Sequence, residues 1–341
     1  VVAIIFYGLH SIGYNKDLTI PNDASQKTLA LELKVVPDIP MIEKILVGDL
    51  YHWIGKSQEE LIDGWGQPNR KDLSAYQYVW WVYTDGVEYY IQCGGENGII
   101  QTVYATGDGL DLEPFRIGTA YDSVNQKLTF ENEVTYSDGF AFFTFRLTPD
   151  DLERRPLAKV ADDLFIQFYF DTFTKQLSSI RMMHADVLLR HQPYEVVYRG
   201  SLPAKPDLKE DDWRQVEMGM ELQIFDISNV IRNRFNKRPL LWEEKVREVA
   251  YLHSKDMNDN NYFSHYSLNG EGLKERLEVS GIYYLSAGEN IAAQYPDAPS
   301  DVEGWLNSEG HREALLMDEY THIGVGVYRF YYTQNFLAKP M

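Results

Sequence analysis

The sequence predicts an α+β fold in two domains, and three observations support this. A short helix followed by aromatic-rich strands occurs twice within residues 46–200, and amphipathic helices alternate with glycine-containing strands within residues 216–341. Proline-containing stretches precede each of these parts. With 341 residues, of which 44% are hydrophobic, the chain is long enough for two cores of ordinary size.

The chain opens with an apolar run, Val1–Leu9, which is too short to span a bilayer. Two interpretations stay open: the end of a signal sequence or membrane anchor, or a short arm that packs on the fold. Residues 10–45 are polar with scattered prolines, so residues 1–45 are interpreted as an anchor remnant and linker. Pro203, Pro206 and the charged run after them predict a second linker at 201–215.

Residues 46–200 contain a degenerate duplication, with copies at about 46–110 and 111–200. Ile54-Gly55-Lys56-Ser57 in the first copy recurs as Ile117-Gly118-Thr119-Ala120. Ser57 and Glu60 predict a capping box at the start of a short helix, which Gly66-Gln67-Pro68 ends. Asn97-Gly98 between two apolar runs predicts a hairpin. The expected strands are 78–83, 87–92 and 99–105 in the first copy, and 140–147, 164–170 and 177–183 in the second.

Residues 216–341 begin with a strong amphipathic helix at 218–235. A second helix at about 243–258 carries His253 on its apolar face, where a hydrogen-bonded core histidine is expected. Further helices are expected near 272–279, at 301–308 and just after it, followed by strands at 323–328 and 331–336. Gly324 and Gly326 alternate along the first of these strands, which indicates a close approach of another backbone.

Charge and composition narrow the classes of partner. A formal net charge of -19 repels phosphate backbones, so nucleic acid is excluded as a ligand, and docking on anionic lipid is disfavoured. Cys93 is the single cysteine, so no intramolecular disulfide forms, and it is expected to be a small buried side chain. The sequence has no His-Glu-x-x-His helix, Gly-x-Ser-x-Gly elbow or Walker loop, so it leaves open whether the protein is an enzyme.

Residues 253–336 contain six short motifs in a fixed order: His253-Ser254-Lys255-Asp256-Met257, Phe263-Ser264-His265, Gly288-Glu289-Asn290, Trp305 through Arg312, Gly324-x-Gly326 and Tyr332-Thr333-Gln334-Asn335-Phe336. This succession resembles bacterial members of the CAP superfamily of cysteine-rich secretory, antigen 5 and pathogenesis-related proteins. The resemblance implies that the C-terminal part is an α-β-α sandwich with a central cleft. Residues 46–200 resemble the CAP-associated N-terminal domain of Firmicutes, whose function is not established; Ile54–Ser57, Gly66–Pro68, Trp80–Tyr83 and Pro114–Gly118 carry this likeness.

In this superfamily the cleft gathers two histidines and two acidic residues, sometimes with a divalent metal. His265 and Glu289 match the first histidine and the first acid. Tyr331 stands where animal members have the second histidine, so His311 of the Gly-His-Arg motif is the candidate for that role. Ser308 stands at the position of the second acid, and its neighbour Glu309 is a weaker candidate.

Two neutral imidazoles and a carboxylate suit Zn²⁺, in which case His265 and His311 would be ligands and an open position would hold water. Without a metal, a His–Glu pair can act as general acid and base, or its members can simply tie loops together by hydrogen bonds. We therefore expect an extracellular or cell-surface protein that binds a small molecule, lipid, peptide or envelope component in the cleft. Membrane contact would run only through an N-terminal anchor. The alternative is a hydrolase that acts outside the cell.

Overall fold

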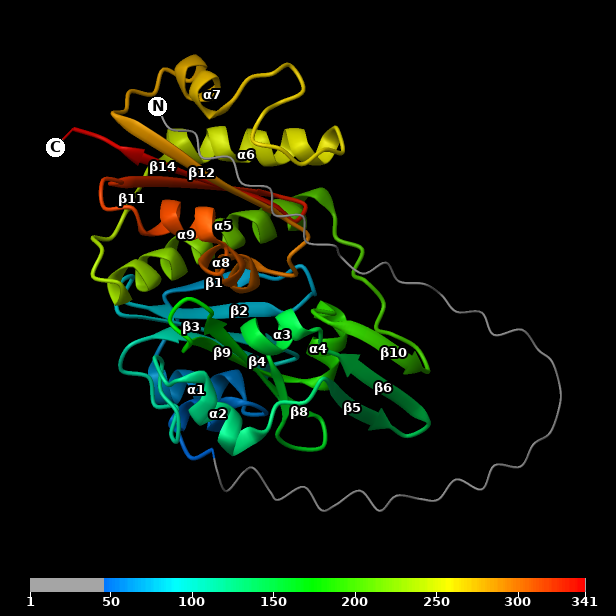
Figure 1. Cartoon of the computed structure of the whole chain (residues 1–341). Coiled ribbons are helices and arrows are strands. Elements are labelled where there is room, and N and C mark those ends of the chain that lie inside the picture. Colours follow the sequence, from blue (N-terminus) through cyan, green and yellow to red (C-terminus); the bar gives the residue numbers. More distant parts are fainter. Residues whose placement is uncertain (1–45, 341) are drawn as a thin grey trace.

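The structure is a computed structural model that describes residues 46–340, so the anchor and linker predicted at 1–45 lie outside the described residues. Its N-terminal part contains a seven-stranded antiparallel sheet with the strand order β1-β2-β3-β4-β9-β8-β7 (Figure 1). The strands of this sheet are β1 (Arg70–Leu73), β2 (Val79–Thr84), β3 (Tyr89–Glu96), β4 (Ile99–Gly107), β7 (Leu157–Lys159), β8 (Leu164–Asp171) and β9 (Gln176–His184). The short helices are η2 (Asp49–Trp53), α1 (Gln58–Trp65), α2 (Tyr121–Leu128), α3 (Pro149–Arg154) and α4 (Ala185–His191).

The two sequence copies contribute to this one sheet and meet where β4 pairs with β9. In each copy, the segment before the first α-helix is hydrogen-bonded to the last strand that the copy contributes to this sheet. The N–H of Gly55 donates to the carbonyl of Ile100 at 2.9 Å, and the N–H of Gly118 donates to that of Leu177 at 2.8 Å. Both glycines have positive φ angles, 78° and 88°, which other residues rarely adopt. The repeat seen in the sequence therefore has a counterpart in matching backbone contacts.

Local signals in the first copy are confirmed. The hydroxyl of Ser57 accepts from the N–H of Glu60, whose carboxylate returns the contact, so the capping box forms. Asn97 and Gly98 both have positive φ, as a two-residue hairpin turn requires. Cys93 is 1% exposed and lies in the core, as expected.

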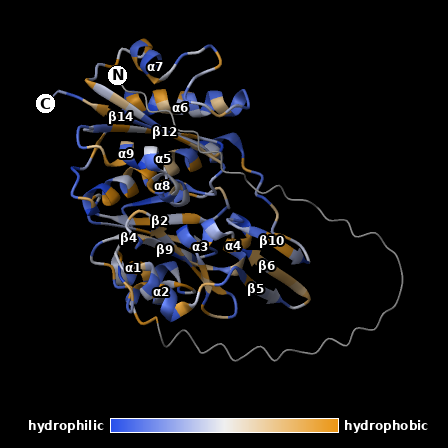
Figure 2. Cartoon of the chain, in the orientation of Figure 1, coloured by the Kyte–Doolittle hydropathy of each residue, from blue (hydrophilic) through white to orange (hydrophobic). Residues whose placement is uncertain are grey.

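A second sheet, with the order β10-β6-β5, projects from the N-terminal part (Figure 1). Its strands are β5 (Glu133–Asp138), β6 (Ala141–Arg146) and β10 (Glu195–Arg199). The predicted strand at 140–147 is thus real, but it does not join the main sheet. Strand β5 was missed because its residues are mostly polar, and β5 and β10 are both largely exposed, whereas β6 itself is strongly hydrophobic (Figure 2).

The C-terminal part is an α-β-α sandwich, which confirms the fold that the resemblance implied. A four-stranded sheet with the order β11-β13-β14-β12 carries helices on both faces (Figure 1). Helix α6 packs closely on β13 and β14, while α5 and α9 contact β13 and β12. The strands are β11 (Leu241–Trp242), β12 (Ser286–Ala293), β13 (His322–Tyr328) and β14 (Tyr331–Ala338), and the helices are α5 (Glu210–Arg234), α6 (Glu244–Asp259), α7 (Leu273–Val279), α8 (Ala298–Leu306) and α9 (Glu309–Leu316).

Gly324 and Gly326 allow the close contact between β13 and α6. A Cβ atom at Gly324 would lie 2.1 Å from the backbone nitrogen of Arg247, and one at Gly326 would lie 1.9 Å from that of Tyr251. Both distances are far inside van der Waals contact, so any side chain would push the helix away. The prediction from the alternating glycines is confirmed.

Helix α5 starts at Glu210, eight residues before the start predicted from the hydrophobic pattern. The charged run that indicated a linker instead supplies Glu210, Asp211 and Asp212 to the first turn of the helix. Negative charges there interact favourably with the helix dipole, so the run begins the helix.

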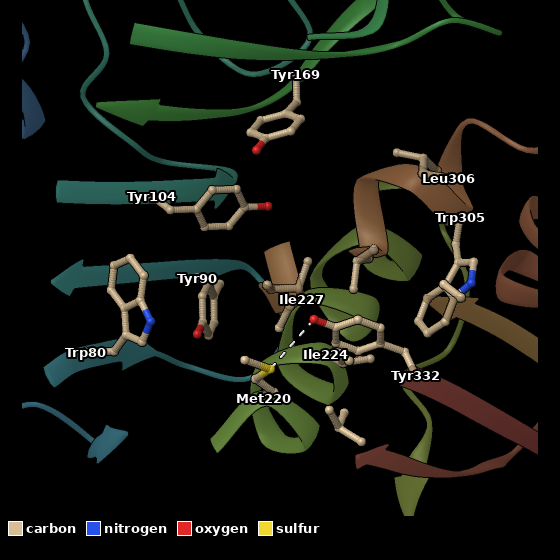
Figure 3. Close-up of a cluster of buried hydrophobic side chains, with 14 of the residues drawn as sticks. Trp80, Tyr90, Tyr104, Tyr169, Met220, Ile224, Ile227, Trp305, Leu306 and Tyr332 are labelled. Atoms are coloured by element: carbon tan, nitrogen blue, oxygen red, sulfur yellow. Dashed lines mark hydrogen bonds between the residues drawn. The ribbon is translucent and has the colours of Figure 1, made fainter. Parts of the chain in front are cut away.

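The two parts of the chain share one hydrophobic core. Helix α5 contacts β1, β3 and β4 with one side and β13 with the other. Figure 3 shows the resulting cluster, in which aromatic side chains of the N-terminal sheet face α5 and α8. It includes Trp80, Tyr90, Tyr104 and Tyr169 from the first part and Met220, Ile224, Ile227, Trp305, Leu306 and Tyr332 from the second. The interface is therefore continuous with the interior of both parts.

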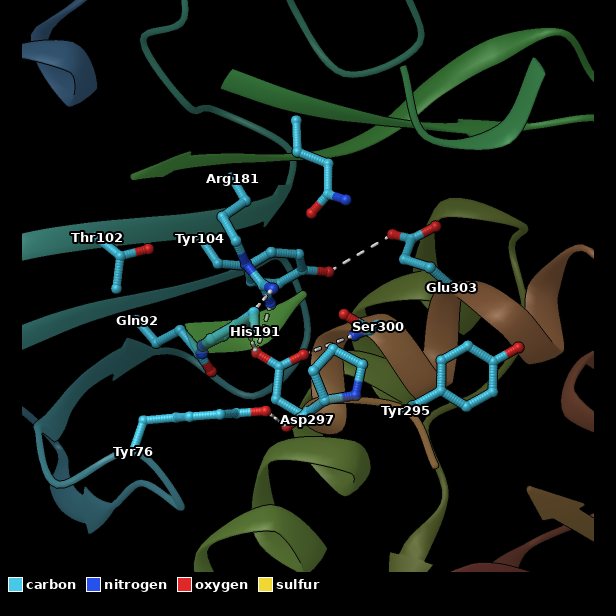
Figure 4. A network of polar contacts seen from close by, with 12 residues as sticks. Tyr76, Gln92, Thr102, Tyr104, Arg181, His191, Tyr295, Asp297, Ser300 and Glu303 are labelled. Atoms are coloured by element: carbon cyan, nitrogen blue, oxygen red, sulfur yellow. Dashed lines mark hydrogen bonds and ion pairs between the residues drawn. The ribbon is translucent and has the colours of Figure 1, made fainter. Parts of the chain in front are cut away.

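Buried polar groups also join the two parts (Figure 4). Arg181 on β9 donates to the carboxylate of Asp297 at 2.6 Å, and both side chains are less than 5% exposed. Ser179 on β9 donates to Glu303 of α8 at 2.5 Å. Such desolvated contacts are costly to break once formed. Among the described residues, no helix is both long and apolar enough to cross a membrane.

Candidate functional site

His265 and Glu289 form the centre of the candidate site. His265 lies in the loop between α6 and α7, and Glu289 lies on β12. The Nδ1 atom of His265 is 2.9 Å from Oε1 of Glu289. The histidine side chain is 20% exposed and the glutamate side chain 4% exposed. The structure thus brings the two principal predicted residues together, with the imidazole on the outside.

Arg276 of α7 binds the other oxygen of Glu289. Its Nη2 atom lies 2.5 Å from Oε2, and its Nη1 atom donates to the backbone carbonyl of His265 at 3.1 Å. One guanidinium therefore fixes both the carboxylate and the loop that carries the histidine. Arg276 was not predicted as a site residue, because its position on an amphipathic helix gives no local signal for a partner 13 residues away.

The charge state of Glu289 follows from these contacts. Burial alone would raise the pKa of this carboxyl, but the charge of Arg276 and the hydrogen bond from His265 outweigh it and hold the pKa at about 2. An ionised carboxylate can only accept hydrogen bonds, so the Nδ1 atom of His265 carries a proton. In the neutral ring, the Nε2 atom is then a hydrogen-bond acceptor. Among residues 46–340, Nε2 of His265 has no hydrogen-bond partner.

His311 lies in the first half of α9, and its Nδ1 atom is 2.9 Å from the hydroxyl of Ser308. Two effects lower the pKa of His311 to about 4: first its burial, and second the charge that His265 carries when protonated. This second effect requires the two imidazoles to lie within electrostatic reach of each other. His311 is therefore neutral near pH 7 and belongs to the same region as His265.

Strand β12 explains how these groups meet. It is an edge strand of the sheet, and its consecutive side chains point to opposite faces. Glu289 meets His265 and Arg276 on one face, while the next residue, Asn290, donates to the backbone carbonyl of His311 at 3.1 Å. We call His265, Arg276, Glu289 and His311 the histidine–glutamate cluster, and it lies around this edge.

His253 supports the cluster from α6. Its Nε2 atom is 3.0 Å from the carbonyl of Ser264, the residue before His265, and the side chain is 1% exposed. Burial lowers the pKa of His253, against the opposing charge of Glu289. The sequence expectation of a hydrogen-bonded core histidine is confirmed.

Glu309, the weaker acidic candidate, is exposed in the first turn of α9. Within residues 46–340, no hydrogen bond or ion pair joins it to His265, Glu289 or His311. Tyr331 begins β14, where it pairs with Ala293 and Tyr328 in the sheet. The structure pairs His265 with Glu289 and places His311 within electrostatic reach of His265, and among the described residues Glu309 is not bonded to any of the three.

The donor set is a poor match for zinc. Both oxygens of Glu289 and the Nδ1 atoms of both histidines already have partners, which leaves the two Nε2 atoms as ligands. Catalytic zinc sites use three protein ligands and structural sites use four. In the part of the chain that the structure describes, no group of three or more His, Cys, Asp or Glu side chains is placed to hold a metal ion. We therefore derive no chemistry from a metal.

Two small cavities lie elsewhere, at the junction of the two parts. One, of about 10 Å³, is lined by residues that include Tyr76, Gln223 and Asp297. The other, of about 80 Å³, is lined by residues that include Gln176, Arg234 and Phe235. Neither includes a member of the histidine–glutamate cluster, whose surface is formed by partly exposed side chains.

Comparison with known proteins agrees with this architecture. Residues 54–194 match the CAP-associated N-terminal family, and residues 225–338 match the cysteine-rich secretory protein family. The chain is 43% identical over 293 residues to the uncharacterized membrane protein YlbC of Bacillus subtilis strain 168, covering 85% of this chain and 84% of that protein.

Two solved structures share the fold. An extracellular protein with an SCP domain from Bacillus anthracis strain Ames has a TM-score of 0.81 and 37% identity, over 96% of this chain and 100% of that one. A cysteine-rich secretory protein of Staphylococcus aureus has a TM-score of 0.74 and 23% identity, over 86% and 96% of the two chains, which shows the fold alone. On this evidence, the chain belongs to the cysteine-rich secretory protein (CAP) family and carries the CAP-associated N-terminal domain.

Proposed function

We propose that the protein is an extracellular or cell-surface binding protein, and that its histidine–glutamate cluster holds a sugar–peptide component of the cell envelope. The observation that carries this proposal is the pairing of both Glu289 oxygens, one with His265 and one with Arg276. A carboxylate held in this way orients the imidazole and does not itself exchange a proton near neutral pH. His265 is then a fixed hydrogen-bonding group that faces outward.

The surroundings favour a neutral ligand with many hydroxyl and amide groups. Phe263 and Tyr266 lie in the same loop as His265, are 47% and 43% exposed, and offer aromatic rings to a ligand. His311 adds a second imidazole, and the lowered pKa of His311 keeps that ring uncharged near pH 7. The net charge of -19 disfavours polyanionic ligands. Peptidoglycan combines sugar hydroxyls with peptide amides and fits this chemistry.

The location is supported by the relatives. One is named a membrane protein and another is described as extracellular. Both descriptions are consistent with a protein that works at or outside the cell surface, where peptidoglycan is accessible.

Co-sedimentation with purified insoluble peptidoglycan tests the proposal. We expect the wild-type chain to sediment with the polymer and His265→Ala to lose most of this binding. His184→Ala is the matched control, because His184 pairs with Asp163 on the N-terminal part, far along the chain from the cluster. Equal binding by wild type and His265→Ala, or no binding by either, would contradict the proposal.

Hydrolysis is the second candidate, since a histidine whose Nδ1 atom faces a carboxylate is also arranged as an oriented general base. The same polymer distinguishes the two. Release of soluble fragments by the wild type, lost in His265→Ala, would establish catalysis. Binding without release would support the binding protein.

A further inference from the structure

The junction between α8 and α9, next to which His311 lies, is bound by residues of the N-terminal domain. Asn307 ends α8 and Arg312 lies in α9, and these two residues bracket Ser308 and His311 along the chain. Both reach across to the turn between β8 and β9 of the N-terminal part. We call this turn, residues 171–175, the clamp turn.

Asn307 is bound to the clamp turn through one end of its amide and to the strand residue just before the turn through the other. Its Oδ1 atom accepts from the N–H of Thr172 at 2.7 Å and from the Thr172 hydroxyl at 2.9 Å. Its Nδ2 atom donates to the carbonyl of Phe170 at 2.9 Å. The residue is 6% exposed, so these contacts are shielded from water and specify one position for the end of α8.

Arg312 makes the second attachment. Its Nη2 atom donates to Oδ2 of Asp171 at 2.9 Å, and the guanidinium lies over the ring of Phe173 at 4.7 Å. Asp171 is 1% exposed, and its other oxygen accepts from the N–H groups of Phe173 and Thr174, which fixes the turn itself. A rigid turn thus holds the start of α9 by a desolvated ion pair.

Ser308 shows what this arrangement does for the cluster. It is the residue before α9, but its hydroxyl does not cap the helix and instead lies 2.9 Å from Nδ1 of His311. Among the described residues, the CAP sheet makes one hydrogen bond with His311, from the side chain of Asn290 to the backbone carbonyl, and this bond does not fix the imidazole. The direction of the imidazole therefore depends on where the junction between α8 and α9 is held.

We propose that the N-terminal domain shapes the candidate site of the CAP domain. Asp171 and Thr172 are positioning residues, which fix the orientation of the His311 imidazole by binding Arg312 and Asn307. The inference rests on the proposed function only in treating His311 as a ligand-contacting group. It assigns the N-terminal domain a role in shaping the site, in addition to its share of the common core.

Histidine-selective NMR of the full chain tests the proposal without any ligand. His311→Gln assigns the ring resonance of His311, and its pH midpoint is then compared in wild type and Asp171→Asn. We expect the variant to shift the resonance and to raise the midpoint by at least about half a pH unit toward the ordinary histidine value, because a loosened junction admits water. Asp163→Asn is the control, since Asp163 lies in the neighbouring turn and pairs with His184. It is expected to move His184 and leave His311 unchanged.

A folded Asp171→Asn chain with an unchanged His311 resonance and midpoint would overturn the proposal, as would an equal shift of His311 in Asp163→Asn. If Asp171→Asn does not fold, Thr172→Val decides, because it removes one hydroxyl contact with Asn307 and keeps the backbone contact. It is expected to shift the His311 resonance in the same direction, and an unchanged resonance overturns the proposal. These outcomes do not depend on peptidoglycan binding, so a failure of the proposed function would be seen separately.

Discussion

The guanidinium of Arg276 and the carboxylate of Glu289 form a buried ion pair at 2.5 Å, with side chains 10% and 4% exposed. This pair lies at the centre of the candidate site and occupies one of the two carboxylate oxygens. An internal cation that holds Glu289 lets His265 keep a fixed direction without any bound ion.

Removing the guanidinium leaves a buried charge without its partner. We expect Arg276→Ala to lower the free energy of unfolding by about 3–5 kcal/mol, as for other broken buried pairs. Lys274→Ala on the same helix is the control, since its exposed pair with Glu278 should contribute less than about 1 kcal/mol. Chemical denaturation measures both variants. Equal, small losses would show that the Arg276 pair does not stabilise the fold.

The depressed pKa of Glu289 makes the stability of the protein depend on acid. A decrease from 4.5 to about 2 corresponds to about 3 kcal/mol of stabilisation by the ionised form. This contribution is present above the unfolded pKa and is lost as the pH falls through the folded one, so the window runs from about pH 4.5 down to about pH 2. Unfolding curves of wild type and Glu289→Gln should therefore differ at pH 6 and converge toward pH 2. A difference that stays constant over this range would contradict the assigned charge state.

The pKa of Asp301 on α8 is shifted upward, in the opposite direction to that of Glu289. It is fully buried, neither carboxylate oxygen has a hydrogen-bond partner among the described residues, and burial together with Asp297 raises its pKa well above the ordinary value. A carboxyl whose pKa is raised on folding costs stability as the pH rises above its unfolded pKa of about 3.9. We expect Asp301→Asn to stabilise the protein at pH 7.5 by at least about 1 kcal/mol, with a smaller gain at pH 4. Denaturation at the two pH values, with the exposed Asp211→Asn as control, measures this. A variant less stable than wild type at pH 7.5 would refute it.

Zinc is expected to have little effect. Only two imidazole nitrogens remain for coordination, and a ligand raises the melting temperature only as far as it binds the folded state. We expect thermal melting with and without excess zinc to agree closely for wild type and for His265→Ala. An increase of several degrees that disappears in His265→Ala would show a metal site that the donor set did not indicate.

Much of the fold follows from local patterns in the sequence. The capping box at Ser57, the hairpin at Asn97-Gly98 and the alternating Gly324 and Gly326 each depend on neighbouring residues, and each is confirmed. The motifs that contain His265 and Glu289 indicated the centre of the candidate site, because their residue types and order are distinctive.

The remaining features depend on contacts between distant segments. In the sequence, Arg276 cannot be distinguished from other charged residues of an amphipathic helix. Its role depends on the packing of α7 beside β12. Thr172 and Asp171 meet Asn307 and Arg312 across 135 and 141 residues of sequence, and no periodicity or capping signal encodes that meeting. Such contacts form because two domains pack on a shared core. Local sequence patterns therefore do not predict them.

The most direct test of the account is the response of the His265 and His311 ring resonances to a soluble peptidoglycan digest at pH 7. The account predicts saturable shifts of both resonances, with His184 unaffected and the His311 response lost in His265→Ala. Unchanged His265 and His311 resonances at saturating digest would contradict the claim that these two imidazoles form a binding site.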